Sequence, residues 1–387
     1  MTIKPSNRSG LVAYPIRDIV IEAKKIEATG KKMSYLNIGD PCVYGFRPPE
    51  HIINAVREAL DKNYSGYAPS QGDPELVKCA AESEGVDEKD LFVTAGLSEG
   101  IDFLFQAMLD PGHNFILPSP TYPLYLTKER IYFGSENFYK SDENLQPDID
   151  DLRKRITPYT QALVLINPNN PTGVVYPKKR VQEFIDVAGE YNLPIISDNA
   201  YDMLVLEGEY PDIRKMHKDV PLIVGNSISK NYIYPGARIA WLSFFGEGLE
   251  GIKDAVQRLC NQRLSVNWEM QKGAIAALTG PKDHIEEFKS DLRKRRDVTV
   301  RRVKEIDGLS LVAPNATFYA FPKIESDKWK TDWDFVRDLL KEGVVTVPGK
   351  GFSSDLDGLY FRMVFLPNET ILNDAFDKIE MLMGSKK

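Results

Sequence analysis

The sequence is poor in the residues that bind metal ions or form disulfides. Its three cysteines, Cys42, Cys79 and Cys260, lie far apart, so neither a disulfide framework nor a paired-cysteine zinc site is expected. Its four histidines follow no metal-binding or catalytic-triad spacing. The sequence also lacks an apolar run of about 20 residues, and its first residues lack the apolar centre of a secretory signal. We therefore expect no metal, no membrane span and a cytoplasmic location.

Excess positive charge is absent as well. Aspartate and glutamate number 56 against 49 lysines and arginines, and the net charge of −7 argues against a nucleic-acid surface. Two basic clusters, at 293–296 and 301–304, fall within a helical pattern and are interpreted as a solvated helix face. With 387 residues, of which 42% are hydrophobic, the chain is long enough for two domains and a large core.

Helical and strand-like patterns alternate through most of the chain. This alternation predicts an α/β architecture, with a mostly parallel sheet covered by helices. Helices are expected near 16–29, 49–62, 98–109, 178–191 and 250–264. Strands are expected near 92–95, 114–118, 162–166, 194–198, 221–227 and 238–244.

The last hundred residues follow a different pattern, with a long helix near 283–305 and short strands between later helices. These elements predict a smaller α+β domain rather than a continuation of the parallel sheet. The strands are expected near 309–312, 317–321, 344–347 and 359–365, and the helices near 332–342 and 369–384.

Lys230 ends the segment Ser227-Ile228-Ser229-Lys230, and Arg238 follows eight residues later, after a Pro-Gly break. A lysine at a strand end is well placed to form a Schiff base with an aldehyde, and two serines and an arginine suit a phosphate. Together they fit pyridoxal phosphate, an aldehyde cofactor that carries a phosphate. Taken alone, Lys230 would be interpreted as a solvated loop lysine.

Two further strand ends carry groups that this cofactor needs. Asp198 ends the apolar run 193–198, where its carboxylate could keep the pyridine nitrogen protonated; the alternative is an ordinary helix N-cap. Three residues later, Tyr201 could donate to the ring oxygen. Asn170 follows the apolar run 162–166 in a loop stiffened by proline and glycine, and is the second candidate donor to that oxygen.

The motifs Asn170-Pro-Thr-Gly, Asp198-x-x-Tyr201 and Ser-x-Ser-Lys230, with Arg238 eight residues on, resemble those of the class I/II aminotransferases of pyridoxal-phosphate fold type I. The resemblance covers nearly the whole chain. It implies an aspartate-aminotransferase-like fold with a mostly parallel, seven-stranded type of sheet. The expected large, cofactor-binding domain is 46–280, and the smaller α+β domain is built from both chain ends, 1–45 plus 281–387.

The same resemblance implies how the cofactor is held. Gly96, Leu97 and Ser98 open an apolar helical pattern, and the free N–H groups of such a helix start suit a phosphate. Tyr122 matches the aromatic residue that stacks on the cofactor ring. Tyr67 matches a tyrosine that reaches the phosphate from the neighbouring subunit, with Tyr64 as a competitor, which implies a homodimer with shared active sites.

Substrate recognition is expected at Arg362, a cation inside the strand pattern 359–365. A charge in such a position is costly unless it is paired, and a substrate carboxylate would pair it with two parallel hydrogen bonds. The alternative is an edge-strand arginine that faces water. The resemblance adds Gly39 and Asn170 to the substrate site. No second arginine can be assigned to a distal carboxylate from the sequence.

The resemblance thus implies an aminotransferase that moves an amino group between an L-amino acid and a 2-oxo acid. Segments 36–41, 146–151 and 278–281 are similar to the alanine branch, so alanine or aspartate with 2-oxoglutarate is the expected pair. A C–S β-lyase, or another lyase of the same fold, is the alternative, because the cofactor alone would demand Lys230 and Asp198. A non-catalytic regulator is the least favoured option, because no residues are spare for a DNA-binding segment.

Overall fold

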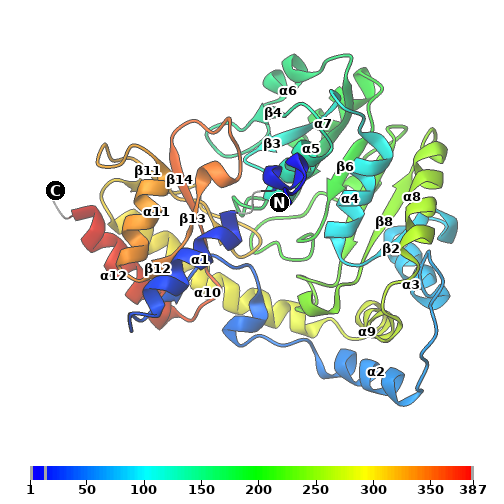
Figure 1. The fold of residues 1–387 in the computed structure, drawn as a ribbon, viewed down its shortest axis with the longest axis horizontal. Helices are drawn as coiled ribbons and strands as arrows, with labels where there is room; N and C mark the ends of the chain where they lie inside the picture. The colour runs from blue at the N-terminus through cyan, green and yellow to red at the C-terminus, as the bar shows by residue number, and fades with distance from the viewer. Residues whose placement is uncertain (1–2, 13–14, 385–387) are drawn as a thin grey trace.

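The computed structural model describes residues 3–12 and 15–384 and contains a sheet of seven strands in the order β2-β8-β7-β6-β5-β3-β4 (Figure 1). Strand β8 runs antiparallel to β2 and β7, whereas all other neighbours are parallel. The predicted α/β class is therefore confirmed, and one reversed strand makes the sheet mixed. The strands are β2 (Leu91–Thr94), β3 (Asn114–Ser119), β4 (Asn137–Lys140), β5 (Thr160–Ile166), β6 (Ile195–Asp198), β7 (Leu222–Ser227) and β8 (Ala240–Phe245).

Strand β5 shows why the central strands are continuous apolar runs. Leu163 and Leu165 belong to the core on one face of the sheet, and Val164 and Ile166 belong to the core on the other face. Both faces are covered, so every side chain from Ala162 to Ile166 is buried and no polar alternation appears there. One face packs on α4 (Leu97–Met108), α5 (Pro123–Ile131) and α8 (Glu250–Arg263), and the other on α6 (Ile149–Arg155) and α7 (Lys178–Glu190).

A third group of helices covers the β2 and β8 edge of the sheet, where Leu91 and Trp241 are buried. It consists of α2 (Glu50–Asp61), α3 (Pro74–Glu84) and α9 (Trp268–Thr279). The five helices predicted before residue 280 are found within two residues of their expected ends. Helices α3, α5, α6 and α9 and strand β4 are missing from the sequence prediction.

The second region is built from both ends of the chain. Strand β1 (Ser34–Tyr35) pairs in parallel with β12 (Val344–Val345), more than 300 residues later. One core joins Ile19 and Leu36 to Phe361 and Phe376. The remaining elements are α1 (Pro15–Glu27), α11 (Asp332–Lys341), α12 (Glu369–Gly384), β9 (Leu309–Ser310), β10 (Tyr319–Ala320), β11 (Lys323–Ile324), β13 (Val347–Pro348) and β14 (Leu359–Val364). The boundaries 46–280 and 1–45 plus 281–387 stay a prediction.

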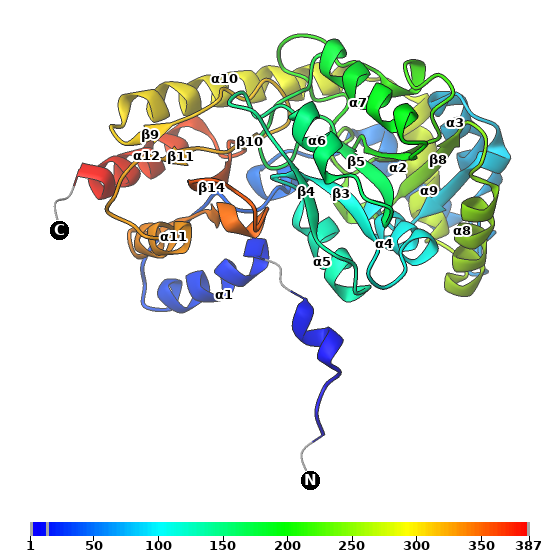
Figure 2. The ribbon, with the colours of Figure 1, turned by 90° about the horizontal axis from the view of Figure 1, so that it is seen from above.

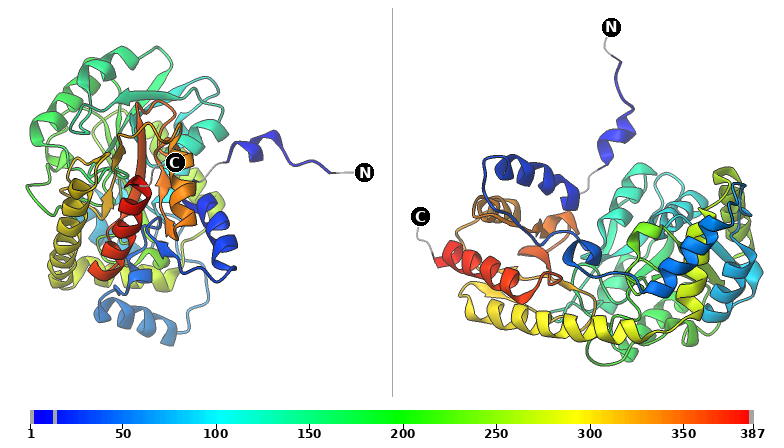
Figure 3. Two further views of the ribbon diagram at one scale, coloured as in Figure 1. Left: turned by 90° about the vertical axis from the view of Figure 1, so that its left-hand side faces the viewer. Right: turned by 90° about the horizontal axis from the view of Figure 1, so that it is seen from below.

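Helix α10 (Asp283–Glu305) runs along one side of the molecule from the sheet to the second region (Figure 2). The sequence predicts that the basic residues of this helix are solvated, and for Arg302 this prediction is wrong. Arg302 is buried and pairs with Asp377 and Glu380 of α12 at 2.8 and 3.1 Å. A separate short helix, η1 (Asn7–Leu11), projects from the body beside α5 (Figure 3). Within residues 3–12 and 15–384, no helix is long and apolar enough to cross a membrane.

Candidate active site

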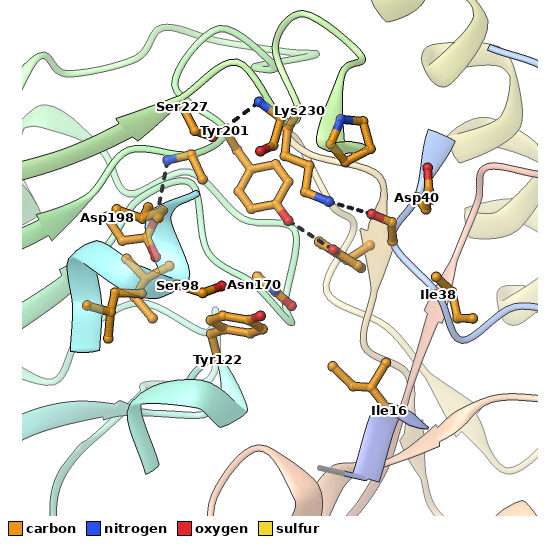
Figure 4. Close-up of a pocket in the computed structure, with 18 of the residues that line it drawn as sticks. Ile16, Ile38, Asp40, Ser98, Tyr122, Asn170, Asp198, Tyr201, Ser227 and Lys230 are labelled. Atoms are coloured by element: carbon orange, nitrogen blue, oxygen red, sulfur yellow. Dashed lines mark hydrogen bonds between the residues drawn. The ribbon is translucent and has the colours of Figure 1, made fainter. Parts of the chain in front are cut away.

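One cavity of about 450 Å³ lies where the carboxyl ends of β5, β6 and β7 face the second region (Figure 4). Open α/β sheets commonly bind ligands at this edge. The cavity gathers every predicted site residue except Gly96 and Tyr67. Its predicted lining residues are Gly39, Leu97, Ser98, Tyr122, Asn170, Asp198, Tyr201, Ser227, Ser229, Lys230, Arg238 and Arg362.

Lys230 follows the end of β7 and points across the cavity. Its Nζ atom donates a 2.6 Å hydrogen bond to the backbone carbonyl of Gly39 (Figure 4). Burial lowers the pKa of the amine to about 8; Asp40 opposes this shift, and the charges of Arg238 and Arg362 add to it. A substantial share of Lys230 is therefore neutral near physiological pH, and a neutral amine is the nucleophilic and basic form.

Asp198 is the last residue of β6, and its side chain is only 6% exposed. Its carboxylate accepts hydrogen bonds from the backbone N–H of Ala200 at 3.1 Å and from the Tyr125 hydroxyl at 3.3 Å. Burial raises the pKa of this carboxyl to about 6, and the two hydrogen bonds hold it back from rising further. Such a site favours a cationic partner, which would restore full ionisation.

Arg362, on β14, is a buried cation with free hydrogen-bonding capacity. Its side chain is 1% exposed, and it donates to the Asn170 side-chain oxygen at 3.0 Å and to the Asn37 carbonyl at 2.6 Å. Its Nε atom has no hydrogen-bond partner, and no ion pair to a carboxylate is found among residues 3–12 and 15–384. The alternative of an edge-strand arginine facing water is therefore wrong. A buried, unneutralised guanidinium suits an anionic ligand.

Helix α4 points its N-terminus at the cavity through Leu97 and Ser98. The preceding Gly96 has φ +79°, and a Cβ atom there would overlap the Arg238 guanidinium. Arg238 hydrogen-bonds the Pro235 carbonyl at 3.0 Å and pairs with no carboxylate of the described chain. Glycine at 96 therefore lets a helix N-terminus and a free cation approach one point, which suits a phosphate.

Two tyrosines close the cavity on the side of the second region. The hydroxyls of Tyr201 and Tyr319 are 2.9 Å apart, and a Cβ atom at Gly39 would overlap the Tyr319 hydroxyl. Tyr122 precedes α5 and lies below Asn170 in the close-up (Figure 4). Burial raises the pKa of Tyr201 well above its usual value, so Tyr201 remains a hydrogen-bond donor at neutral pH.

The sequence prediction misses several lining residues that come from the start of the chain. Ile16 and Arg17 reach the cavity from the first turn of α1, and Ile38 and Asp40 flank Gly39. Arg17 is exposed and has no ion pair in the described part of the chain. Tyr67, in contrast, is 76% exposed and lies outside the lining.

The residues present fit pyridoxal phosphate. The cavity offers a low-pKa amine at Lys230, a buried carboxylate at Asp198 and a free cation at Arg238 beside a helix N-terminus. These groups match the aldehyde, the pyridine nitrogen and the phosphate of the cofactor. The Nε atom of Arg362, which has no hydrogen-bond partner in the described part of the chain, suits a further anionic group beside them.

Comparison with known proteins supports the same conclusion. Residues 31–375 match the family "Aminotransferase class I and II". The glutamate-pyruvate aminotransferase AlaA of Escherichia coli is 34% identical over 94% of both chains, and an aspartate aminotransferase of Pyrococcus horikoshii is 28% identical over 96% of this chain and 95% of its own. The structure of an alanine aminotransferase from Pyrococcus furiosus superposes with a TM-score of 0.96 at 42% identity, covering 99% of this chain and all of its own. The chain therefore belongs to the class I and II aminotransferases, enzymes that move amino groups between amino acids and 2-oxo acids with pyridoxal phosphate.

Proposed function

We propose that this aminotransferase exchanges the amino group between L-alanine and 2-oxoglutarate, forming pyruvate and L-glutamate. Two arginines, Arg362 and Arg17, lie on one cavity with the Lys230 amine, and neither has a carboxylate partner within residues 3–12 and 15–384; this observation carries the proposal. Two cations suit a substrate with two carboxylates, such as glutamate. The names of the Escherichia coli and Pyrococcus furiosus relatives favour the same pair.

Arg362 binds the carboxylate next to the reacting carbon in this proposal. Its unpaired Nε and its Nη atoms offer the planar pair of donors that a carboxylate accepts. Asn170 and the Gly39 backbone complete the same subsite. Arg17 lies on α1 and is assigned to the distal carboxylate of glutamate, which alanine lacks.

The cofactor site is assigned from the same lining. Asp198 holds a proton on the ring nitrogen, Asn170 and Tyr201 donate to the ring oxygen, and Tyr122 covers one face of the ring. The phosphate is assigned to the start of α4 and to the segment around Lys230. The proposed phosphate ligands are Gly96, Leu97, Ser98, Ser227, Ser229 and Arg238.

Proton movement is the task of Lys230. Pyridoxal phosphate, when bound, supplies an electron sink for the charge that develops at the substrate's α-carbon. The Lys230 amine would take the proton from that carbon as general base and, as general acid, deliver it to the carbon of the cofactor's aldehyde group. Its pKa of about 8 suits both tasks near neutral pH. Asp198 would stabilise the developing charge by keeping the ring nitrogen of the bound cofactor protonated.

We also propose a homodimer in which Tyr67 of one subunit reaches the phosphate site of the other, in a cytoplasmic enzyme. The exposed position of Tyr67 supports this role, because an aromatic side chain 76% open to solvent is available for a partner. Tyr64 is the less suitable candidate, because its ring packs on Trp268 and its hydroxyl bonds the Tyr67 carbonyl at 2.9 Å. Sedimentation of wild-type protein, with cofactor affinity measured for Tyr67→Phe and Tyr64→Phe, tests the assignment.

Half-reactions test the proposed activity. The cofactor-loaded protein is mixed with L-alanine, L-glutamate, L-aspartate or L-phenylalanine, one at a time, and the cofactor's visible absorbance and the 2-oxo acid products are followed. Alanine and glutamate should convert the cofactor to its amine form fastest. Fastest conversion by aspartate or phenylalanine would refute the alanine assignment. Release of ammonia and pyruvate from a cysteine conjugate, without the amine form, would indicate a lyase instead.

A further inference from the structure

The segment that carries Lys230 is tied down at both ends by one carboxylate outside the cavity. Asp202 accepts a hydrogen bond from the Asn226 amide at 3.1 Å through one oxygen and from the Asn231 amide at 2.7 Å through the other. Between these two asparagines lie Ser227, Ser229 and Lys230. Asn226 and Asn231 are almost fully buried, and Asp202 is absent from the residues that line the cavity.

Asp202 also belongs to the segment that carries Asp198 and Tyr201. It comes four residues after Asp198 and directly after Tyr201, and its backbone N–H donates to the Asn199 carbonyl at 3.1 Å. This backbone turn fixes Asp202 relative to Asp198. The two hydrogen bonds of the Asp202 side chain therefore also fix the segment of Lys230 relative to the Asp198 carboxylate. No other carboxylate in residues 3–12 and 15–384 accepts hydrogen bonds from both Asn226 and Asn231.

A partly buried ionic network of Glu84, Arg214 and Asp212 adjoins Asp202, and it shares Asn226 with Asp202. Glu84, at the end of α3, accepts from the Trp241 indole at 2.8 Å and from Asn226 at 3.3 Å. Arg214 donates to Glu84 at 2.7 Å and continues outward to Asp212 at 2.6 Å. The titratable and charged groups whose fields reach Asp202 are Glu84, Arg214, Tyr210 and Tyr232.

We propose that Asp202 is a positioning residue for transamination, which sets where the Lys230 amine stands relative to Asp198 by bridging Asn226 and Asn231. The inference rests on the role of Lys230 proposed above. Asp202 touches neither substrate nor cofactor and acts only through the two asparagines. Its loss lets the Lys230 segment shift, and a displacement of about 1 Å at a reacting group can cost about 100-fold in rate.

Burial disfavours the charged form of Asp202, so the effect of a neutral substitution on stability can be compared with its effect on catalysis. Burial, followed by the field of Glu84, raises the pKa of Asp202 to about 7. A carboxyl with a raised pKa binds its proton more tightly in the folded state, so its contribution to stability is present at low pH and lost as pH rises through 7. Asp202→Asn removes this penalty at pH 8, and its amide oxygen keeps one of the two accepted hydrogen bonds. The melting temperature at pH 8 should therefore fall by no more than a few degrees.

The test compares Asp202→Asn with Asp212→Asn, the same chemical change at the outer end of the network. Asp202→Asn should lower kcat about 10- to 100-fold with little change in KM, and Asp212→Asn should leave both near wild type. In cofactor-free protein, the rate of reductive methylation of Lys230, mapped by mass spectrometry, should change in Asp202→Asn and not in Asp212→Asn. This second measurement does not depend on the activity of the loaded enzyme.

A double-mutant cycle tests whether Asp202 acts through Asn231. Asn231→Ser removes the other partner of the 2.7 Å bond. If the two residues act as one unit, the double variant should be no slower than the slower single variant. Multiplied losses, unaltered Lys230 methylation or a melting temperature at pH 8 lowered by more than a few degrees would each overturn the proposal. If wild-type protein shows no transamination, the proposed function fails, whereas the methylation comparison still judges the positioning role.

Discussion

The Nζ atom of Lys230 and the carbonyl oxygen of Gly39 lie 2.6 Å apart, although 191 residues separate them in the chain. This hydrogen bond joins the end of a sheet strand to the backbone at the start of the second region. The bond therefore places the Lys230 amine at the boundary between the two regions.

The pKa of Lys230 predicts an unusual reactivity profile. A pKa of about 8, lowered by burial from 10.5, means that the neutral amine becomes dominant above pH 8 rather than above pH 10.5. In cofactor-free protein, reductive methylation of Lys230 should be half-maximal near pH 8. Because Asp40 raises this pKa, Asp40→Asn should move the midpoint lower. A midpoint near 10.5, or an upward shift in Asp40→Asn, would contradict the burial of this amine.

Replacement of Lys230 should abolish turnover without unfolding the protein. Lys230→Ala removes the only group proposed to move the proton, and general acid–base catalysis alone contributes about 100- to 10,000-fold. The melting temperature should change little, because the amine makes one hydrogen bond and no salt bridge among the described residues. Borohydride reduction of the wild type, followed by peptide mapping, should find the pyridoxyl mass on Lys230. Its appearance on a different lysine would refute the assignment.

Arg362→Lys should weaken substrate binding more than catalysis. Lysine keeps the charge but cannot present the planar donors of Nε and Nη to a carboxylate. A lost hydrogen bond to a charged group is worth about 1.5–3 kcal/mol, so KM for alanine and glutamate should rise about 10- to 100-fold. Steady-state kinetics with both amino acids measure this effect. An unchanged KM for both would remove Arg362 from the substrate site.

Arg17 should distinguish glutamate from alanine. Arg17→Met removes the exposed cation from the cavity wall and keeps much of its length. Since alanine has no distal carboxylate, its KM should stay near wild type, while KM for glutamate and 2-oxoglutarate should rise about tenfold or more. Arg57→Met, on the outer face of α2, is the control and should change none of these values. Equal losses for alanine and glutamate would show that Arg17 does not read the distal carboxylate.

Gly96→Ala should impair cofactor binding beyond the backbone strain that it introduces. Gly85 provides a control for positive φ, because it has φ +81° against +79° at Gly96 and a Cβ atom there would meet nothing within 4 Å. Gly85 has ψ 37°, in the left-handed helical region, so its substitution should destabilise the fold by about 1–2 kcal/mol. Gly96 has ψ 157°, a conformation that is essentially restricted to glycine, so Gly96→Ala should destabilise the fold by more. Only Gly96→Ala should weaken affinity for pyridoxal phosphate, because its methyl group displaces the Arg238 guanidinium. Equal affinities in the two variants would place the phosphate elsewhere.

The sequence could predict the parts of the site that lie on strand ends and rigid loops. Asn170, Asp198 and Lys230 each follow a buried apolar run, and parallel strands bring such ends to one edge of a sheet. The order of strands, including the reversal of β8, could not be predicted in this way. A short apolar run has the same pattern in either direction, because both faces of the strand are buried.

Residues that enter the site through tertiary packing could not be predicted. Arg17 reads as an exposed position on an amphipathic helix, and only the docking of α1 turns it toward the cavity. Tyr125 reads as a core residue, although its hydroxyl reaches Asp198. Helix α3, in contrast, carried usable signals that the prediction missed: the Asp73 N-cap, proline in the first turn and Gly85 at the end.

The pairing of β1 with β12 has a consequence for the newly made protein. Gly39 and Asp40 lie just beyond β1, and the partner strand comes at residues 344–345. A ribosome that has translated two thirds of the message has therefore produced Lys230 and Asp198 but not β12, the strand that pairs with β1. Arg362 on β14 also lines the cavity, so the cavity is complete only when translation is nearly over. A prematurely terminated chain would contain the Lys230 amine but lack this side of the cavity.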